Sequence, residues 1–79
     1  MLIRTQNKMG LVLFENIEYI GITSLGSDKY QITASQADCT FGLGKYNSKG
    51  ACMEVLENIY YCYGNKCICY QMPEVIEDE

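Results

Sequence analysis

The residues best suited to chemistry in this chain are its five cysteines, Cys39, Cys52, Cys62, Cys67 and Cys69. Cys62, Cys67 and Cys69 follow a C-x4-C-x-C spacing, which gathers three thiols around one turn. Structural zinc sites use four ligands, so a metal site here would need Cys39 or Cys52 as its fourth. A redox disulfide between Cys62 and Cys67 is a second interpretation of the same spacing.

An odd number of cysteines argues against a disulfide framework. The first ten residues, MLIRTQNKMG, contain no apolar stretch of the kind found in secretion signals, so we expect a cytoplasmic protein. Reduced thiols are then the leading interpretation, and Cys52 falls where a small buried side chain is expected. We accordingly predict no metal ligand and no cofactor.

Catalysis finds little support in the sequence. There is no histidine, which is the commonest general base in enzymes. A thiol nucleophile needs a base, and without histidine only a Lys, a Glu or a helix N-terminus could help. Cys52 falls near the first turn of a predicted helix, which could lower its pKa, but it lies on the face expected to be buried. Glu54 and Glu57 lie three residues apart on the solvent side of a predicted helix, and residues 42–45, GLGK, lack the spacing of a phosphate loop. We predict no catalytic residues and a protein that is not an enzyme.

One amphipathic helix is predicted over residues 48–63. Its apolar positions recur with a period of 3.6 residues, at Cys52, Val55, Leu56, Ile59 and Tyr63. Ser48 is a suitable N-cap, and Gly64 is expected just beyond the last turn. Because a single apolar stripe needs a surface to cover, we expect this helix to pack on a sheet.

The remaining segments have the alternation and the turn residues of short strands. The expected strands are 2–6, 11–14, 17–23, 30–34, 39–46 and, after the helix, 66–72. A run of strands followed by a helix and a terminal strand predicts an α+β fold, with an antiparallel sheet covered by the helix. We expect one domain over residues 1–73 and an acidic solvated tail over residues 74–79.

The formal net charge of −4 is concentrated at one end of the chain. Residues 74–79 hold four of the ten acidic residues and no base, which leaves six acids and six bases in residues 1–73. A neutral domain without a basic cluster makes direct nucleic-acid binding an unfavoured function. No run of about 18 apolar residues is present, so no membrane association is expected.

Several segments resemble a family of small uncharacterised proteins from low-GC Gram-positive bacteria and their phages and mobile elements. The opening MLIRTQNK is similar to that family's I-R-[ST]-Q-[DN]-K start, and residues 43–46 match its L-G-x-Y segment before a helix. Val55-Leu56 and Met72-Pro73-Glu74 match its V-L pair and its closing M-P with acids. The resemblance implies a cytoplasmic setting and a phage or mobile-element gene, but neither an activity nor a role for the cysteines.

These observations favour a non-enzymatic binding module, phage or mobile-element encoded, that engages a host protein or sequesters a small anionic host ligand, with counter-defence as one use. The contact residues we expect are Arg4, Gln6 and Lys8, with Tyr61 as an aromatic anchor. An aromatic side chain left outside the core also predicts association of the chain with itself as a homo-oligomer. The alternative function is a small metal- or redox-responsive protein that uses Cys62, Cys67 and Cys69.

Overall fold

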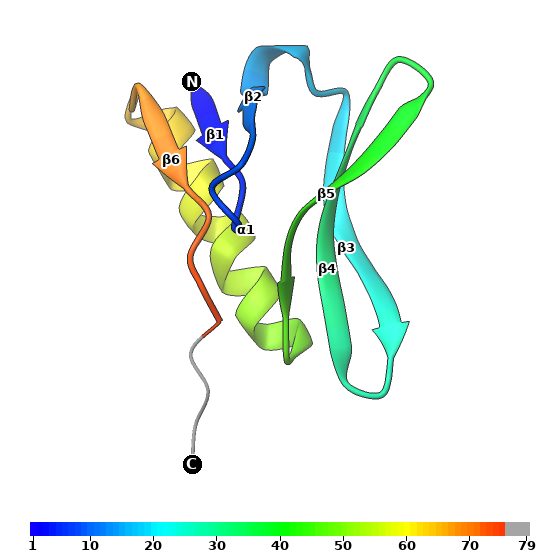
Figure 1. The fold of residues 1–79 in the computed structure, drawn as a ribbon. Coiled ribbons are helices and arrows are strands. Elements are labelled where there is room, and N and C mark those ends of the chain that lie inside the picture. Colours follow the sequence, from blue (N-terminus) through cyan, green and yellow to red (C-terminus); the bar gives the residue numbers. More distant parts are fainter. Residues whose placement is uncertain (76–79) are drawn as a thin grey trace.

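The computed structural model describes residues 1–75 of the 79-residue chain (Figure 1). It contains six strands, one short 3-10 helix (η1) and one α-helix, and the predicted α+β class is confirmed. In chain order the elements are β1 (Leu2–Arg4), β2 (Leu11–Leu13), η1 (Phe14–Asn16), β3 (Tyr19–Gly26), β4 (Lys29–Gln36), β5 (Cys39–Tyr46), α1 (Lys49–Gly64) and β6 (Cys69–Gln71).

The strands form two three-stranded sheets instead of one. The sheet of short strands has the order β2-β1-β6, and the sheet of long strands has the order β3-β4-β5. The pairs β1–β2, β3–β4 and β4–β5 are antiparallel, whereas β6 runs parallel to β1. A parallel partner is accessible to β6 because the whole of α1 precedes it, so no tight hairpin dictates its direction.

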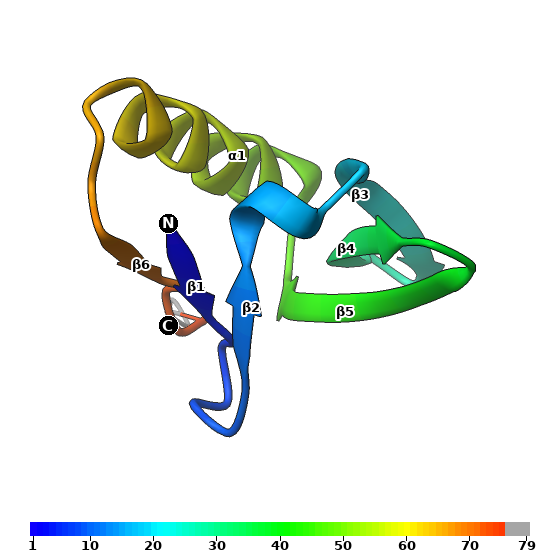
Figure 2. The same cartoon turned by 90° about the horizontal axis from the view of Figure 1, so that it is seen from above.

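Helix α1 covers the inner side of both sheets, as the view from above shows (Figure 2). Its buried residues are Cys52, Val55 and Ile59, and they join a core that also contains Ile3, Ile32, Ala34, Leu43, Tyr46 and Met72. Alternation along the strands supplies the sheet side of this core, because every second side chain turns inward. Among the described residues, no charged side chain is buried, and the buried side chains that carry a polar group are those of Tyr46 and Cys52.

The ends of α1 partly confirm the prediction. Ser48 is the N-cap, and its hydroxyl oxygen accepts the backbone N–H of Ala51 at 3.1 Å. Gly64 lies inside the helix, not beyond it; Asn65 is the C-cap, and Lys66 takes the left-handed conformation with φ of 61°. The prediction that Tyr63 is core was wrong, because its half-exposed ring packs instead on Phe14, with centroids 4.8 Å apart.

The C-terminal segment returns across the domain after β6. The N–H of Met72 donates to the carbonyl of Arg4 at 3.0 Å, and the phenol of Tyr46 donates to the carbonyl of Pro73 at 2.8 Å. The expected acidic tail is described as far as Val75, and its acids at Glu77, Asp78 and Glu79 lie outside the described residues. Glu74 contacts Lys8, with Oε2 and Nζ 3.5 Å apart.

Candidate functional site

The outer side of the β2-β1-β6 sheet, opposite α1, is largely apolar. Register places two rows of side chains on it, Leu13–Leu2–Cys69 and Leu11–Arg4–Gln71, while Val12, Ile3 and Tyr70 form the inner row. Ile3 is fully buried, whereas Leu11 is 67% exposed and Leu2 and Leu13 are also exposed. We call this surface the β1 face.

The outer side of the β3-β4-β5 sheet, which we call the β4 face, has the opposite character. Two hydroxyl contacts lie on it: the Oγ1 atoms of Thr23 and Thr33, which are diagonal neighbours, lie 3.1 Å apart, and Ser35 Oγ and Thr40 Oγ1, which belong to a register pair, lie 3.3 Å apart. Hydroxyl pairs suit a sheet surface that faces water. The β4 face thus carries hydroxyl contacts with the exposed Tyr19 at one end, opposite Ser35, whereas the β1 face exposes leucines.

Arg4 lies at the centre of the β1 face. It is exposed, and among residues 1–75 no carboxylate lies within 4.0 Å of its guanidinium group. Its planar fork can therefore receive a carboxylate from outside this part of the chain in a bidentate pair. The adjoining β1–β2 turn adds a hollow of about 560 Å³, lined by Arg4, Lys8, Met9, Gly10 and Leu11.

The β1–β2 turn holds Lys8 and Met9 in place through its own hydrogen bonds. Asn7 Oδ1 accepts from the Thr5 hydroxyl at 2.8 Å and from the N–H of Met9 at 2.9 Å. Lys8 has a positive φ of 65°, and its own N–H donates to the carbonyl of Thr5 at 2.9 Å. Met9 is therefore 86% exposed although hydrogen bonds hold the backbone of its turn.

Gln6 does not belong to the β1 face, although alternation from Leu2 and Arg4 predicts that it should. Strand β1 ends at Arg4, and the Gln6 side chain turns toward β5. Its Oε1 accepts from the N–H of Lys45 at 2.9 Å, and its Nε2 donates to the carbonyls of Lys45 at 2.9 Å and Pro73 at 3.2 Å. The Gln6 amide therefore has all its hydrogen-bond partners within the protein, and it links the two sheets.

Tyr61 belongs to α1, which lies on the inner side of the β2-β1-β6 sheet, opposite the β1 face (Figure 2), and it is not among the buried residues of that helix. It is 72% exposed, and Tyr60 and Met53 are exposed on the same helix. Of the four predicted contact residues, the structure therefore brings only Arg4 and Lys8 together. Sequence analysis missed Leu2, Leu11 and Leu13, whose shared exposure follows from strand register.

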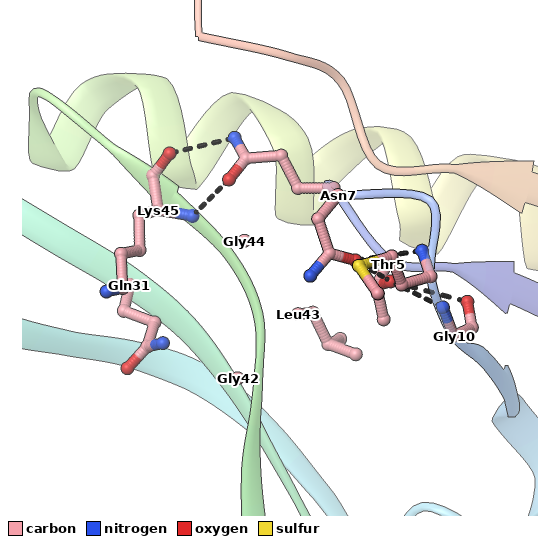
Figure 3. A pocket seen from close by; sticks show the side chains of 10 residues that line it. Thr5, Asn7, Gly10, Gln31, Gly42, Leu43, Gly44 and Lys45 are labelled. Atoms are coloured by element: carbon pink, nitrogen blue, oxygen red, sulfur yellow. Dashed lines mark hydrogen bonds between the residues drawn. The ribbon is translucent and has the colours of Figure 1, made fainter.

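A cleft of about 440 Å³ lies between the β1–β2 turn and β5 (Figure 3). Gly42, Leu43 and Gly44 line it along β5, and Gln31, Asn7 and Lys45 bring polar groups to it. Among residues 1–75, Lys45 is the one cationic residue that lines it, and no aromatic residue does. This lining can offer hydrogen bonds to a small polar molecule, but it gives weak electrostatic attraction for an anion.

The three clustered cysteines separate into a pair and a single residue. Cys62 lies in the last turn of α1 and Cys67 follows the turn after it; the N–H of Cys67 donates to the carbonyl of Cys62 at 3.0 Å. Desolvation raises the pKa of the Cys62 thiol, and the neighbouring Cys67 side chain raises it further. Cys69 lies on the β1 face beside Leu2. Within residues 1–75, no three Cys, Asp or Glu side chains converge as a metal site would require.

Burial also raises the pKa of the Cys52 thiol. Cys52 is fully buried in the core, so its reactive thiolate form is disfavoured. No helix among the described residues has both the length and the apolar character needed to cross a membrane. Comparisons of the chain with protein-family models, curated proteins and solved structures gave no match.

Proposed function

We propose that this chain is a non-enzymatic binding module that engages a partner protein through the β1 face. The observation that carries the proposal is the contrast between the two sheets: the β4 face carries hydroxyl contacts and has Tyr19 at one end, whereas the β1 face exposes Leu2, Leu11 and Leu13 on neighbouring strands. Clustered apolar side chains on a small domain mark a surface that a partner covers.

Arg4 indicates the chemistry of that partner. Arg4 lies between Leu11 and Gln71, with Leu2 on the same face of its own strand, and a guanidinium in this setting suits a carboxylate presented beside apolar side chains. Desolvation on binding strengthens such a pair. The expected partner element is therefore an amphipathic segment with an Asp or Glu within its apolar stripe. The resemblance of the sequence to phage and mobile-element proteins makes a host protein in the cytoplasm the expected partner, with counter-defence as one use.

Sequestration of a small anionic ligand has weaker support. Two cations are near the β1 face, but Lys8 is already close to Glu74, and the hollow beside Arg4 is lined mainly by Met9, Gly10 and Leu11. Within the described residues, the cleft at β5 has Lys45 as its one cation. A partner protein would contact both the leucines and Arg4, whereas a small anion would contact Arg4 alone.

The test is site-specific photo-crosslinking in cells of a low-GC Gram-positive bacterium. A photoreactive residue at Leu11 samples the β1 face, and the same residue at Thr40 samples the β4 face as a matched control. We expect a discrete crosslinked protein from position 11, none from position 40, and loss of the product when Arg4→Glu is added. Equal products from both positions, or a product from position 11 that ignores Arg4→Glu, would contradict the proposal.

A redox response is the second candidate, and one observation favours it: a backbone hydrogen bond from the N–H of Cys67 to the carbonyl of Cys62 holds these two cysteines together around the turn after α1. Two thiols form one disulfide bond by giving up two protons and two electrons. A small-molecule disulfide accepts them and becomes two thiols. This candidate uses Cys62 and Cys67 without Cys69, and requires that the bond forms between these two residues in the folded protein.

A further inference from the structure

The two edges of the β3-β4-β5 sheet differ in how their backbone groups are used. Along β5, Gln6 occupies the edge: its N–H donates to the carbonyl of Leu43 at 2.9 Å, and its side-chain amide pairs with the N–H and carbonyl of Lys45. A side-chain amide thereby replaces a neighbouring strand at this position. The edge at β5 is in this way partly closed by the chain itself.

The opposite edge, along the eight residues of β3, has no such cover. Every second residue of a strand directs its N–H and carbonyl away from its neighbour, here away from β4. In the described part of the chain, no backbone–backbone hydrogen bond outside the β3–β4 ladder involves residues 19–26, and at the hairpin end the N–H of Gly26 donates to the Ser24 hydroxyl within the strand. In Figure 1 the end of β3 near the β3–β4 hairpin lies at the border of the molecule, away from α1.

The usual protections of an edge strand are also missing from most of β3. Natural edges carry lysine, proline, inward-pointing charges or bulges that prevent pairing with another chain. The sequence of β3, YIGITSLG, has no charged residue and no proline, and its one irregularity lies at the hairpin end, between Ser24 and Gly26. Tyr19 is 66% exposed at one end and Leu25 is exposed at the other.

We propose that two copies of this chain associate by antiparallel pairing of their β3 edges. The result is a continuous six-stranded sheet with the order β5-β4-β3-β3-β4-β5. Because the strand is uncharged, two identical copies meet without like charges opposing one another along its length. A two-fold axis at Ile22 sets Tyr19 of one copy opposite Leu25 of the other, which pairs the two exposed large side chains.

This inference is independent of the proposed function, because β3 and the β1 face belong to different sheets. A dimer formed in this way leaves the β1 face of each copy open. It also gives a small domain additional strand pairing, which a core of this size benefits from.

The test uses two lysine substitutions that differ only in whether the new lysine lies on the edge strand or on the central strand of the sheet. Thr23→Lys and Thr33→Lys each remove the same hydroxyl pair and each add one positive charge to the β4 face. Thr23 lies on the edge strand and Thr33 on the central strand, so only Thr23→Lys brings two ammonium groups close to the two-fold axis. Sedimentation velocity from micromolar to millimolar concentration measures dimerisation of both variants and of the unmodified chain.

We expect the unmodified chain and Thr33→Lys to dimerise similarly, and Thr23→Lys to dimerise at least about tenfold more weakly. Hydrogen exchange on the unmodified chain provides a readout that needs no variant: amides of residues 19–26 should gain protection as concentration rises. A monomer at every concentration, or a dimer whose residues 19–26 gain no protection, would overturn the proposal. So would capture of β3 by a strand of a different protein in place of a second copy.

Discussion

Gln6 pairs with Lys45 as a strand residue would, but with its side chain: Oε1 accepts the N–H of Lys45 and Nε2 donates to its carbonyl, each at 2.9 Å. The same Nε2 reaches the carbonyl of Pro73. One amide therefore connects the segment after β1, the end of β5 and the segment after β6. Gln6 therefore links the two sheets through its side-chain amide.

Gln6→Glu should destabilise the fold by about 2 kcal/mol near neutral pH, since the carboxylate would face two carbonyl oxygens that the amide now donates to. Those carbonyls favour the protonated acid, so the pKa of Glu at this position should be higher in the folded state than in the unfolded state. Stability should therefore recover as pH falls below the folded-state pKa. Urea unfolding followed by circular dichroism at several pH values measures this.

Gln36→Glu is the matched control for that experiment. It makes the same change in charge at an exposed position at the end of β4. Its effect on the free energy of unfolding should stay within about 0.5 kcal/mol. If Gln6→Glu were no more destabilising than Gln36→Glu, or if its effect were independent of pH, the hydrogen bonds of Gln6 would not stabilise the link between the two sheets.

Local sequence patterns were sufficient to predict most elements of the fold. The alternation and the flanking turns predicted β5 at Cys39–Tyr46, with the bounds observed. Ser48 was predicted as N-cap and is one. These features depend on neighbouring residues, which is why sequence alone could predict them.

The errors arise where distant segments decide the outcome. Alternation from Leu2 could not predict that β1 ends at Arg4, so Gln6 was assigned to the wrong surface. Likewise, nothing local to residues 66–72 indicates that β6 pairs in parallel with β1. The β1 face consists of residues from three strands, and it becomes visible only when their register is known.

The hydrogen bond from Tyr46 to Pro73 predicts a pH-dependent loss of stability in alkali. Burial raises the pKa of the Tyr46 phenol above its usual value of about 10, and Tyr70 and Cys52 nearby raise it further. The folded state therefore holds the phenol proton more tightly than the unfolded state. The contribution of the protonated Tyr46 phenol to the free energy of unfolding is complete below about pH 10 and is lost as pH rises above that.

Tyr46→Phe should therefore lower the free energy of unfolding by about 1 kcal/mol near neutral pH, through loss of the 2.8 Å hydrogen bond. The difference from the unmodified chain should shrink as pH rises above about 10. Denaturant titrations of both proteins across this range measure that difference. A difference that grows with pH would contradict the raised pKa.

The five cysteines should react with an alkylating reagent in an order set by exposure. Cys39, Cys67 and Cys69 are exposed and should react first, the half-buried Cys62 should react more slowly, and Cys52 should react only when the chain unfolds. Peptide mapping by mass spectrometry after increasing times of labelling gives this order. Rapid labelling of Cys52 in the folded protein would contradict its position in the core.

The same mapping tests the redox candidate. After exposure to oxidised glutathione, we expect a disulfide between Cys62 and Cys67, with Cys69 still open to alkylation. Cys62→Ser should abolish that disulfide, whereas Cys39→Ser should leave it unchanged. Mixed disulfides at Cys67 without closure onto Cys62 would count against a redox function of the pair.

Arg4 lies on the β1 face and Tyr61 on α1, on the opposite side of the β2-β1-β6 sheet. Only one of the two substitutions should therefore weaken binding of the partner. With the partner identified by crosslinking, Arg4→Ala should weaken binding by at least about tenfold, because the partner's carboxylate would lose its guanidinium. Lys45→Ala removes one positive charge at the cleft beside β5 and should leave affinity within about threefold. Tyr61→Ala, at an exposed position of α1, should also leave it unchanged. Calorimetric titration of the three variants decides between the surfaces: a loss confined to Tyr61→Ala would move the binding site from the β1 face to the helix.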